Sequence, residues 1–414
     1  MPRTVHIIGA GLAGLAAAVR LSGRGVALII HEASDRGGGR CRSYDDAATG
    51  MRIDNGTHIL LSGNTAALAF LDNIGATALV AGAPTARFPF VDLAAHQRWT
   101  LDFGTGRLPF WIFDSRRRVP GTRAWHYFPL LRLLWPAREK PLGTVVPCDG
   151  EAYRRLVRPF LLAALNIDPS ASSPALARAV LRETIALGGA ALRPYLAPKG
   201  LSAAFVEPAI ALLQRQGATL NFGHELHRLA SAGDVVTGLD FGGEIVAVEP
   251  DDAVVLAVPP HAASAIVPNL RAPDEYRAII NAHFRITPPP DLAPMTGVIG
   301  GMAEWIFAFD DRICVTISGA DRFLQHQRHE IARMLWHDVT RVANIAAELP
   351  PWQIVRERRA TFAATPAQNA RRPGAATAWR NLVLAGDWTD TGLPATIEGA
   401  VRSGNRAADL VLTQ

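Results

Sequence analysis

The alternation of apolar and small residues at the start of the chain predicts a strand, a tight turn and a helix. Val5 to Ile8 form a short apolar run, and Leu15 to Leu21 form a second run that is rich in alanine. Between them three glycines match the spacing G-x-G-x-x-G, which allows a turn, a close backbone approach to a pyrophosphate, and tight packing of helix on strand. The residues that we expect at the phosphates are Gly9, Gly11, Leu12, Ala13 and Gly14.

The next apolar run, 26–31, predicts a second strand that ends at Glu32, followed by Ala33. An acid at this place can accept both ribose hydroxyls of an adenosine, and it disfavours the 2′-phosphate of NADP. The alternative for the first twenty residues is a signal peptide, with a basic start, an apolar stretch and three alanines at 16–18. The second strand and its acid favour a dinucleotide site.

Two further segments favour FAD over NAD. Gly38, Gly39 and Arg40 follow the ribose acid and offer another close backbone approach together with a cation for the pyrophosphate. Near the other end of the chain, a buried strand over 381–385 leads into Gly386 and Asp387, where a carboxylate can hold the ribityl hydroxyls of a flavin. A helix then runs to residue 408, and its N-terminus can face the flavin pyrimidine; its expected contacts are Pro394, Ala395, Thr396 and Ile397. The alternatives are an ordinary glycine-rich loop and an ordinary strand and terminal helix.

With these motifs the chain resembles the superfamily of FAD-dependent amine oxidases and phytoene desaturases. Within it, the stretches 55–64, 159–166 and 386–399 are similar to one branch, the hydroxysqualene dehydroxylases of bacterial hopanoid synthesis. Ile167, where threonine is expected, and Gly37, a third glycine in the loop, depart from the pattern. Neither departure removes a group that the superfamily uses on FAD.

The resemblance implies an α/β fold in which a discontinuous Rossmann-type FAD-binding domain carries an inserted α+β substrate-binding domain. The FAD-binding domain is expected over 1–64, 198–261 and 371–414, and the substrate-binding domain over 65–197 and 262–370. Between 198 and 261 the pattern predicts a helix over 203–216, strands over 218–222 and 225–229, a hairpin over 235–248 that turns at two glycines, and a buried strand over 252–258.

The resemblance also implies a reaction, the FAD-dependent reductive removal of the hydroxyl of hydroxysqualene to give squalene. Gly56, Thr57 and His58 are expected to reach the flavin, and the backbone near Leu226 to lie beside the adenine. His58 and Asp390 are the candidates for protonating the leaving hydroxyl. The alternatives are an FAD-dependent desaturase or oxidase of a carotenoid precursor or an amine, and a non-enzymatic accessory protein that binds FAD. Amine oxidation would favour a lysine near the flavin, and the chain has only Lys140 and Lys199.

The charge of the chain is concentrated in one segment. The net charge is +5, and residues 107–140 alone hold eight basic and two acidic side chains together with seven aromatic ones. Basic residues beside tryptophan and leucine suit an anionic membrane surface; the alternatives are a solvated arginine face and nucleic acid, for which no reader motif is present. We therefore expect a cytoplasmic protein, peripheral at the inner membrane, with an apolar prenyl or triterpene substrate and no nucleic acid partner.

Other features narrow the chemistry. No stretch of about 20 uninterrupted apolar residues is present, so no membrane-spanning helix is expected. The three cysteines match no metal spacing, so no metal is expected. There is no second glycine-rich unit with strand and acid, so NADPH is not expected to bind and the electron donor stays unassigned.

Overall fold

The computed structural model describes residues 3–135 and 140–414. One of its two large sheets is entirely parallel, with the strand order β10-β2-β1-β14-β20. Its strands come from three distant parts of the chain, within 1–64, 198–261 and 371–414. The central strand β1 and the strands β14 and β20 are largely buried, as is typical of a parallel sheet, whereas the edge strand β10 is partly exposed. The strands are β1 (Thr4–Ile8), β2 (Ala27–Glu32), β10 (Thr219–Phe222), β14 (Ala253–Leu256) and β20 (Leu382–Leu384).

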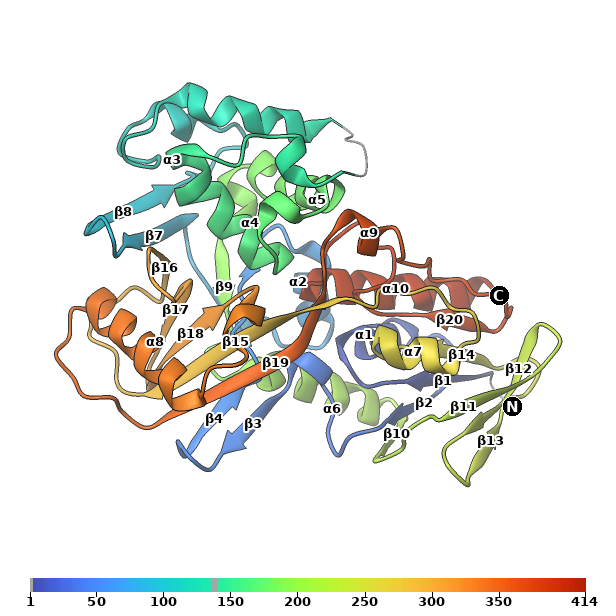
Figure 1. Ribbon diagram of the computed structural model, residues 1–414. Coiled ribbons are helices and arrows are strands. Elements are labelled where there is room, and N and C mark those ends of the chain that lie inside the picture. Colours follow the sequence, from blue (N-terminus) through green and yellow to red (C-terminus); the bar gives the residue numbers. More distant parts are fainter. Residues whose placement is uncertain (1–2, 136–139) are drawn as a thin grey trace.

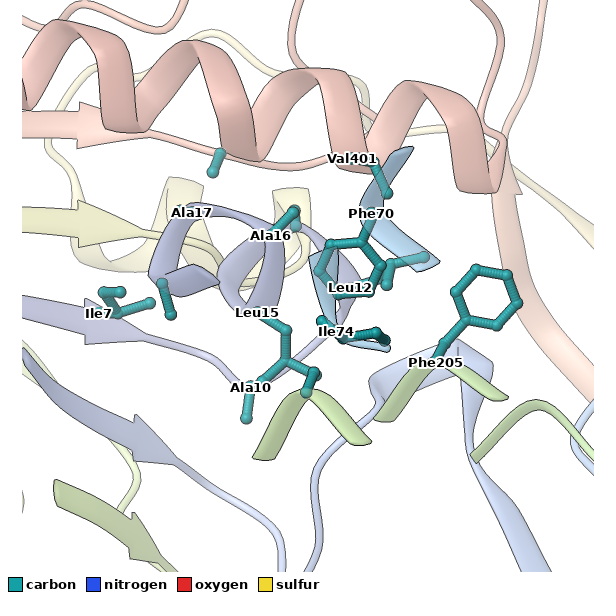
Figure 2. Close-up of a cluster of buried hydrophobic side chains, with 14 of the residues drawn as sticks. Ile7, Ala10, Leu12, Leu15, Ala16, Ala17, Phe70, Ile74, Phe205 and Val401 are labelled. Carbon is teal, nitrogen blue, oxygen red and sulfur yellow. The ribbon is translucent and has the colours of Figure 1, made fainter. Parts of the chain in front are cut away.

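Helices α1 (Leu12–Leu21) and α10 (Ile397–Thr413) pack against each other beside this sheet. The contact is close because Gly404 of α10 lies against the backbone of Ala13, where a Cβ would collide with the carbonyl oxygen. Figure 2 shows the alanine-rich surface of α1 beneath α10, with Val401 above it and Phe70 and Phe205 to one side. The beginning and the end of the described chain are thereby joined in one core.

The second large sheet is mixed and has the order β19-β15-β18-β17-β16-β7-β8. Helix α8 (Arg328–Ala343) covers one of its faces through a core that includes Ile280, Phe284 and Leu335, and Figure 1 shows this helix beside the orange strands. The strands are β7 (Arg87–Asp92), β8 (Gln97–Asp102), β15 (Tyr276–Arg285), β16 (Met295–Ile299), β17 (Trp305–Phe309), β18 (Arg312–Ile317) and β19 (Trp352–Phe362).

Helical segments and small sheets complete the molecule around these two sheets (Figure 1). The remaining helices are α2 (Thr65–Asn73), α3 (Gly150–Ala152), α4 (Arg158–Leu165), α5 (Pro174–Glu183), α6 (Glu207–Arg215), α7 (Pro260–Ile266) and α9 (Pro366–Asn369). The small sheets pair β3 (Ser43–Asp46) with β4 (Met51–Asp54), β9 (Pro194–Leu196) with β5 (Leu60–Leu61) and β6 (Ala81–Gly82), and β12 (Val235–Asp240) with β11 (Arg228–Ala232) and β13 (Ile245–Ala247). In the described ranges no helix is both long and apolar enough to cross a bilayer.

Most of the predicted elements between 198 and 261 are confirmed, with two differences. The hairpin of β12 and β13 turns at Gly242 and Gly243, as predicted. The predicted strand 225–229 is wrong at its start, because β11 begins only at Arg228. Before it, the backbone N–H groups of Gly223 and His224 donate to the carbonyl oxygens of Ser34 and Glu32, and that of His227 donates to Asp240 of β12. The predicted helix 203–216 opens with a π-helical turn over 202–206 before α6.

The basic aromatic segment 107–140 forms two 3-10 helices, η3 (Phe110–Phe113) and η4 (Ala124–Leu134). The strong apolar run over 130–135 therefore does not form a regular α-helix, and Pro129 lies inside η4. Residues 136–139, which include Arg138 and Glu139 of the predicted membrane-contact segment, lie outside the described residues.

Candidate functional site

The glycine-rich loop closes tightly between β1 and α1. Gly9 has a φ of +104°, and a Cβ there would lie 2.7 Å from the carbonyl oxygen of Ala257, so only glycine suits the position. Gly11 differs, because its φ is −70° and a Cβ there would meet nothing within 4 Å. The open side of Gly11 is the space into which a pyrophosphate can approach, as the motif predicts.

The second glycine pair lies directly beside this loop. Gly38 donates its backbone N–H to the carbonyl oxygen of Ala10 at 2.8 Å and forms a parallel bridge with Gly11. Gly38 and Gly39 both have positive φ, at +106° and +54°. The two glycine-rich segments, 27 positions apart, therefore present their backbones at one place.

Glu32 lies at the carboxyl end of β2, where the adenosine ribose is expected. Its Oε2 accepts a hydrogen bond from the backbone N–H of Ala10 at 2.7 Å, and its Oε1 accepts one from Ser34 at 3.0 Å. Ala33 is exposed beside it. The backbone of His224 pairs with the carbonyl oxygen of Glu32, and Leu226 is buried two residues further on. The segment that was expected to flank the adenine is thus adjacent to the ribose acid.

Arg40 and Asp387 form an ion pair that joins the glycine-rich loop to the C-terminal strand. The Nη2 atom of Arg40 lies 2.7 Å from both carboxylate oxygens of Asp387, and its Nη1 atom donates to the carbonyl oxygen of Ala360 at 2.6 Å. Burial opposes the charge of Arg40, but the attraction of Asp387 outweighs it, so the pKa of Arg40 is raised. The side chain of Asp387 is 7% exposed and that of Arg40 is 43% exposed, so the guanidinium keeps a free face for a ligand.

The loop after β20 is fixed by Arg372, which sequence reasoning missed. This buried guanidinium donates to the carbonyl oxygens of Asp387, Trp388 and Thr389. Burial lowers the pKa of Arg372 to about 10. A lone arginine in the sequence gives no sign that three carbonyl groups will converge on it, so only the structure reveals its role in positioning Asp387.

Helix α10 begins where the sequence predicted, close to Asp387 in the chain. The Thr396 side chain accepts a hydrogen bond from the backbone N–H of Gly399 at 3.0 Å and so caps the helix. Buried Pro394 and half-buried Ala395 precede the cap, and Ile397 is the first helical residue. Gly386, with a φ of +150°, donates its N–H to Ser403 of the same helix at 2.9 Å. The helix start is thereby held to the strand that carries the acid.

Glu398, in the first turn of α10, contacts the start of α2. It accepts hydrogen bonds from the backbone N–H groups of Ala66 and Ala67 at 3.1 and 2.8 Å, which are at the start of α2. It also accepts one from Arg402 at 2.7 Å, and Arg402 pairs with Glu183. Glu398 thus stabilises the N-terminus of another helix.

The segment with Gly56, Thr57 and His58 is held by the mixed sheet. On β15, His283 bonds the carbonyl oxygen of Asp54 at 3.0 Å, and Asn281 donates to the carbonyl oxygen of Asn55 at 3.2 Å. The Asn55 side chain donates to Glu357 of β19 at 3.1 Å. A signal for the first two was present, since Asn281 and His283 alternate with apolar residues over 280–284 of an otherwise apolar run, but sequence reasoning did not use it.

The two candidate acids have different surroundings. Burial, with a smaller contribution from the nearby charge of Arg40, lowers the pKa of His58 to about 4, so His58 is neutral at neutral pH. Asp390 is exposed, and its carboxylate accepts a weak bond from the N–H of Gly392 at 3.3 Å. His58 thus lies within the influence of Arg40, whereas Asp390 belongs to an exposed turn.

Comparisons with known proteins agree with this geometry. The family model described as flavin containing amine oxidoreductase matches residues 12–412. A hydroxysqualene dehydroxylase from Rhodopseudomonas palustris is 58% identical over 413 residues, which is 100% of this chain and 99% of that protein. A second protein of the same name, from Sinorhizobium fredii, is 54% identical over 414 residues, with 100% and 99% coverage.

Among solved structures, the fold is similar to that of cyclohexylamine oxidase from Brevibacterium oxydans. The TM-score is 0.73 at 17% sequence identity, and the match covers 100% of this chain and 99% of that one. At this identity the likeness concerns the fold alone.

Proposed function

This chain belongs to the family of flavin-containing amine oxidoreductases, and within it we propose that the chain removes the hydroxyl of hydroxysqualene reductively to give squalene, in the synthesis of hopanoids. The observation that carries the proposal is the pair of relatives of that name, which match from end to end at more than half identity. The two matches cover 100% of this chain and 99% of each relative. The chain is an FAD-dependent oxidoreductase.

The described residues fit FAD. The open side of Gly11 leaves room for the pyrophosphate, and the partly exposed side chain of Arg40 can pair with it. Glu32 can accept hydrogen bonds from the adenosine ribose, and Asp387 from the ribityl hydroxyls of the flavin. We infer that the three segments of the parallel sheet form a discontinuous Rossmann-type domain over 1–64, 198–261 and 371–414, with the substrate-binding domain over 65–197 and 262–370. Bound FAD in its reduced form supplies the hydride.

The protein's own part in the reaction is to exclude water and to position the hydroxyl. An aromatic cluster lies on the mixed sheet face opposite α8, and half-buried Ile59, next to His58, packs against it. An apolar wall of this kind keeps water from a carbon that loses its hydroxyl. His58 was the first candidate for protonating the leaving hydroxyl, but with a pKa of about 4 it holds no second ring proton at neutral pH. We propose instead that its ring N–H donates a hydrogen bond to that hydroxyl, which would leave as water with the proton that reduced FAD carries besides its hydride. Asp390 is the second candidate.

Anaerobic single turnover tests the proposal. The purified flavoprotein is reduced, hydroxysqualene is added, and flavin absorbance and products are followed. We expect the flavin to reoxidise in step with squalene formation; reduced flavin that stays reduced would refute the proposal. In parallel, the oxidised protein is offered phytoene and an amine. Flavin reduction by either would favour the desaturase or oxidase alternative, and bound flavin without turnover in any arm would indicate an accessory protein.

We further propose that the protein is cytoplasmic and peripheral at the inner membrane. A triterpene has about thirty carbons, and at about 0.8 kcal/mol for each apolar carbon its transfer from bilayer to water costs on the order of 20 kcal/mol. Diffusion of the substrate through water is therefore too slow to supply the site. Direct transfer from lipid to an apolar protein surface avoids this cost.

A further inference from the structure

We propose that the surface formed by η3, η4 and the loop before η3 docks on an anionic phospholipid bilayer. Twelve large apolar side chains are strongly exposed among the described residues, and seven of them lie between 108 and 135, each at least half exposed. We call these residues the docking surface: Leu108, Phe110, Phe113, Trp125, Phe128, Leu131 and Trp135. An exposed apolar patch of this kind on a folded protein marks a site of interaction.

The docking surface is held by a folded scaffold. Trp111 and Tyr127, from the same two helices, are buried and pack edge to face with their ring centroids 5.4 Å apart. The hydroxyl of Tyr127 also bonds the backbone N–H of Val119 at 3.2 Å and the hydroxyl of Thr122 at 2.8 Å. Trp111 and Tyr127 thus anchor η3 and η4 to the protein. Because these two side chains fill the inner positions, the residues of the docking surface project outward.

The charges around the docking surface match an anionic partner. Arg107, Arg116, Arg123, Arg132 and Lys140 are exposed in the same segment. The guanidinium of Arg123 lies over the ring of Trp125, at 4.9 Å from its centroid. Asp114 is the acid among the described residues of 107–140, and it already pairs with Arg116 at 3.3 Å. Cations beside aromatic and aliphatic side chains suit the headgroup region of an anionic bilayer.

The same charges disfavour a second copy of this chain as the occupant. Two docking surfaces face to face would bring like positive charges together, and such juxtaposition opposes association. In Figure 1 the teal segment that carries the surface forms the upper edge of the molecule, above α3 and α5. No described part of the chain lies beyond it in that view, so a broad, flat partner can reach it.

A cluster of packed apolar side chains connects the docking surface with the interior. Buried Trp111 packs on Phe103 at 4.8 Å between ring centroids, Phe103 on Phe160 at 5.8 Å, and Phe160 on Trp305 at 6.1 Å. The cluster that contains these rings also includes Cys314 and contacts Ile59 and Leu61, next to His58. Docking at this surface would therefore place the bilayer at the outer end of the apolar cluster whose inner end borders the candidate site. That docking delivers substrate to the candidate site rests on the proposed function, whereas the docking itself does not.

Vesicle co-sedimentation of the full-length flavoprotein tests the proposal. Vesicles of phosphatidylglycerol and phosphatidylcholine are compared with pure phosphatidylcholine at about 0.15 M salt. Two double variants remove one contribution each, Phe110→Ser with Phe113→Ser, and Arg116→Glu with Arg123→Glu. The matched control is Arg333→Glu with Met334→Ser, an exposed pair on α8. We expect at least tenfold weaker binding to anionic vesicles for both docking variants and wild-type binding for the control.

Several outcomes would overturn the proposal. These are wild-type binding by both docking variants, equal loss in the control, no preference for anionic vesicles, or tighter binding to single-stranded nucleic acid than to vesicles. Turnover of detergent-dispersed hydroxysqualene serves as the check on folding, and the docking variants should retain it while losing turnover of vesicle-borne substrate. If the wild type binds vesicles but turns over neither form, docking is supported and the proposed function fails.

Discussion

Replacing Gly11 by alanine separates cofactor binding from folding. The Cβ at this position enters open space, and the backbone already has a φ of −70°, which alanine adopts readily. If that space receives the pyrophosphate, the added methyl group occupies part of it. The comparison is Gly9→Ala, two residues earlier in the same loop, where φ is +104° and the Cβ lies 2.7 Å from a backbone oxygen.

The two changes differ in magnitude for the apoprotein. At Gly11, alanine is a poorer N-cap by about 0.5 to 1 kcal/mol, but it reduces the entropy of the unfolded chain by about 0.4 to 1 kcal/mol. The unfolding free energy should therefore stay within about 1 kcal/mol of wild type. At Gly9, the strained backbone costs about 1 to 3 kcal/mol and the overlap about 1 to 3 kcal/mol more. That variant should lose about 2 to 6 kcal/mol.

FAD should protect the Gly11→Ala protein poorly. At a ligand concentration of 100 times the wild-type Kd, binding stabilises the wild type by about 2.7 kcal/mol. If the methyl group weakens binding about a hundredfold, the same concentration contributes only about 0.4 kcal/mol. Urea unfolding with and without added FAD measures both quantities, and quenching of flavin fluorescence gives Kd directly. A Gly11→Ala apoprotein as unstable as Gly9→Ala, or one with the wild-type Kd, would refute the reasoning.

Three further predictions concern titration and the ion pair. Burial raises the pKa of Glu304 from an ordinary 4.5 to about 7, so the stabilisation by its protonated form is complete below pH 4.5 and is lost as the pH rises past 7. Between pH 5 and 8, the unfolding free energy of the wild type should therefore fall by up to about 3 kcal/mol relative to that of Glu304→Gln. If urea unfolding gives the same pH dependence for both proteins, this prediction is wrong. His58→Gln should lower kcat about tenfold through one lost hydrogen bond and leave the pH profile between 5 and 8 unchanged in shape; full turnover with bound FAD would exclude His58, and loss of a limb in that range would show that it titrates there. Asp387→Asn should raise the Kd for FAD at least about tenfold, because the acceptor loses its charge and Arg40 its partner; an unchanged fluorescence titration would remove Asp387 from the site.

The sequence predicted those parts of the candidate site that are formed by a single short segment of the chain. The loop at Gly9 to Gly14, the acid at Glu32 and the start of α10 at Ile397 each depend on neighbours within a few positions, and the structure has each where the local pattern predicts. Even the nearness of Gly38 to Gly11 follows from a short connection.

Features that depend on distant partners were not predictable in this way. His283 and Asn281 hold a loop more than two hundred positions away. The three carbonyl groups that Arg372 binds are 15 to 17 positions away, but they converge on it only because of the path of the chain after β20. The strand expected from 225 begins only at Arg228, and the backbone of Gly223 and His224 just before it is held by Ser34 and Glu32, which lie far earlier in the chain. Local propensity gives no information on which distant groups will satisfy a polar atom.

The pairing of the two ends of the chain has a consequence for how the protein is made. β1 and α1 leave the ribosome early, but their neighbours β20 and α10 are the last elements of the described chain. Until residues 382–413 emerge, the alanine-rich surface of α1 lacks its cover and Arg40 lacks Asp387. Contacts so distant along the chain form late. The core around α1 and the ion pair of Arg40 with Asp387 can therefore be complete only after residues 382–413 have emerged.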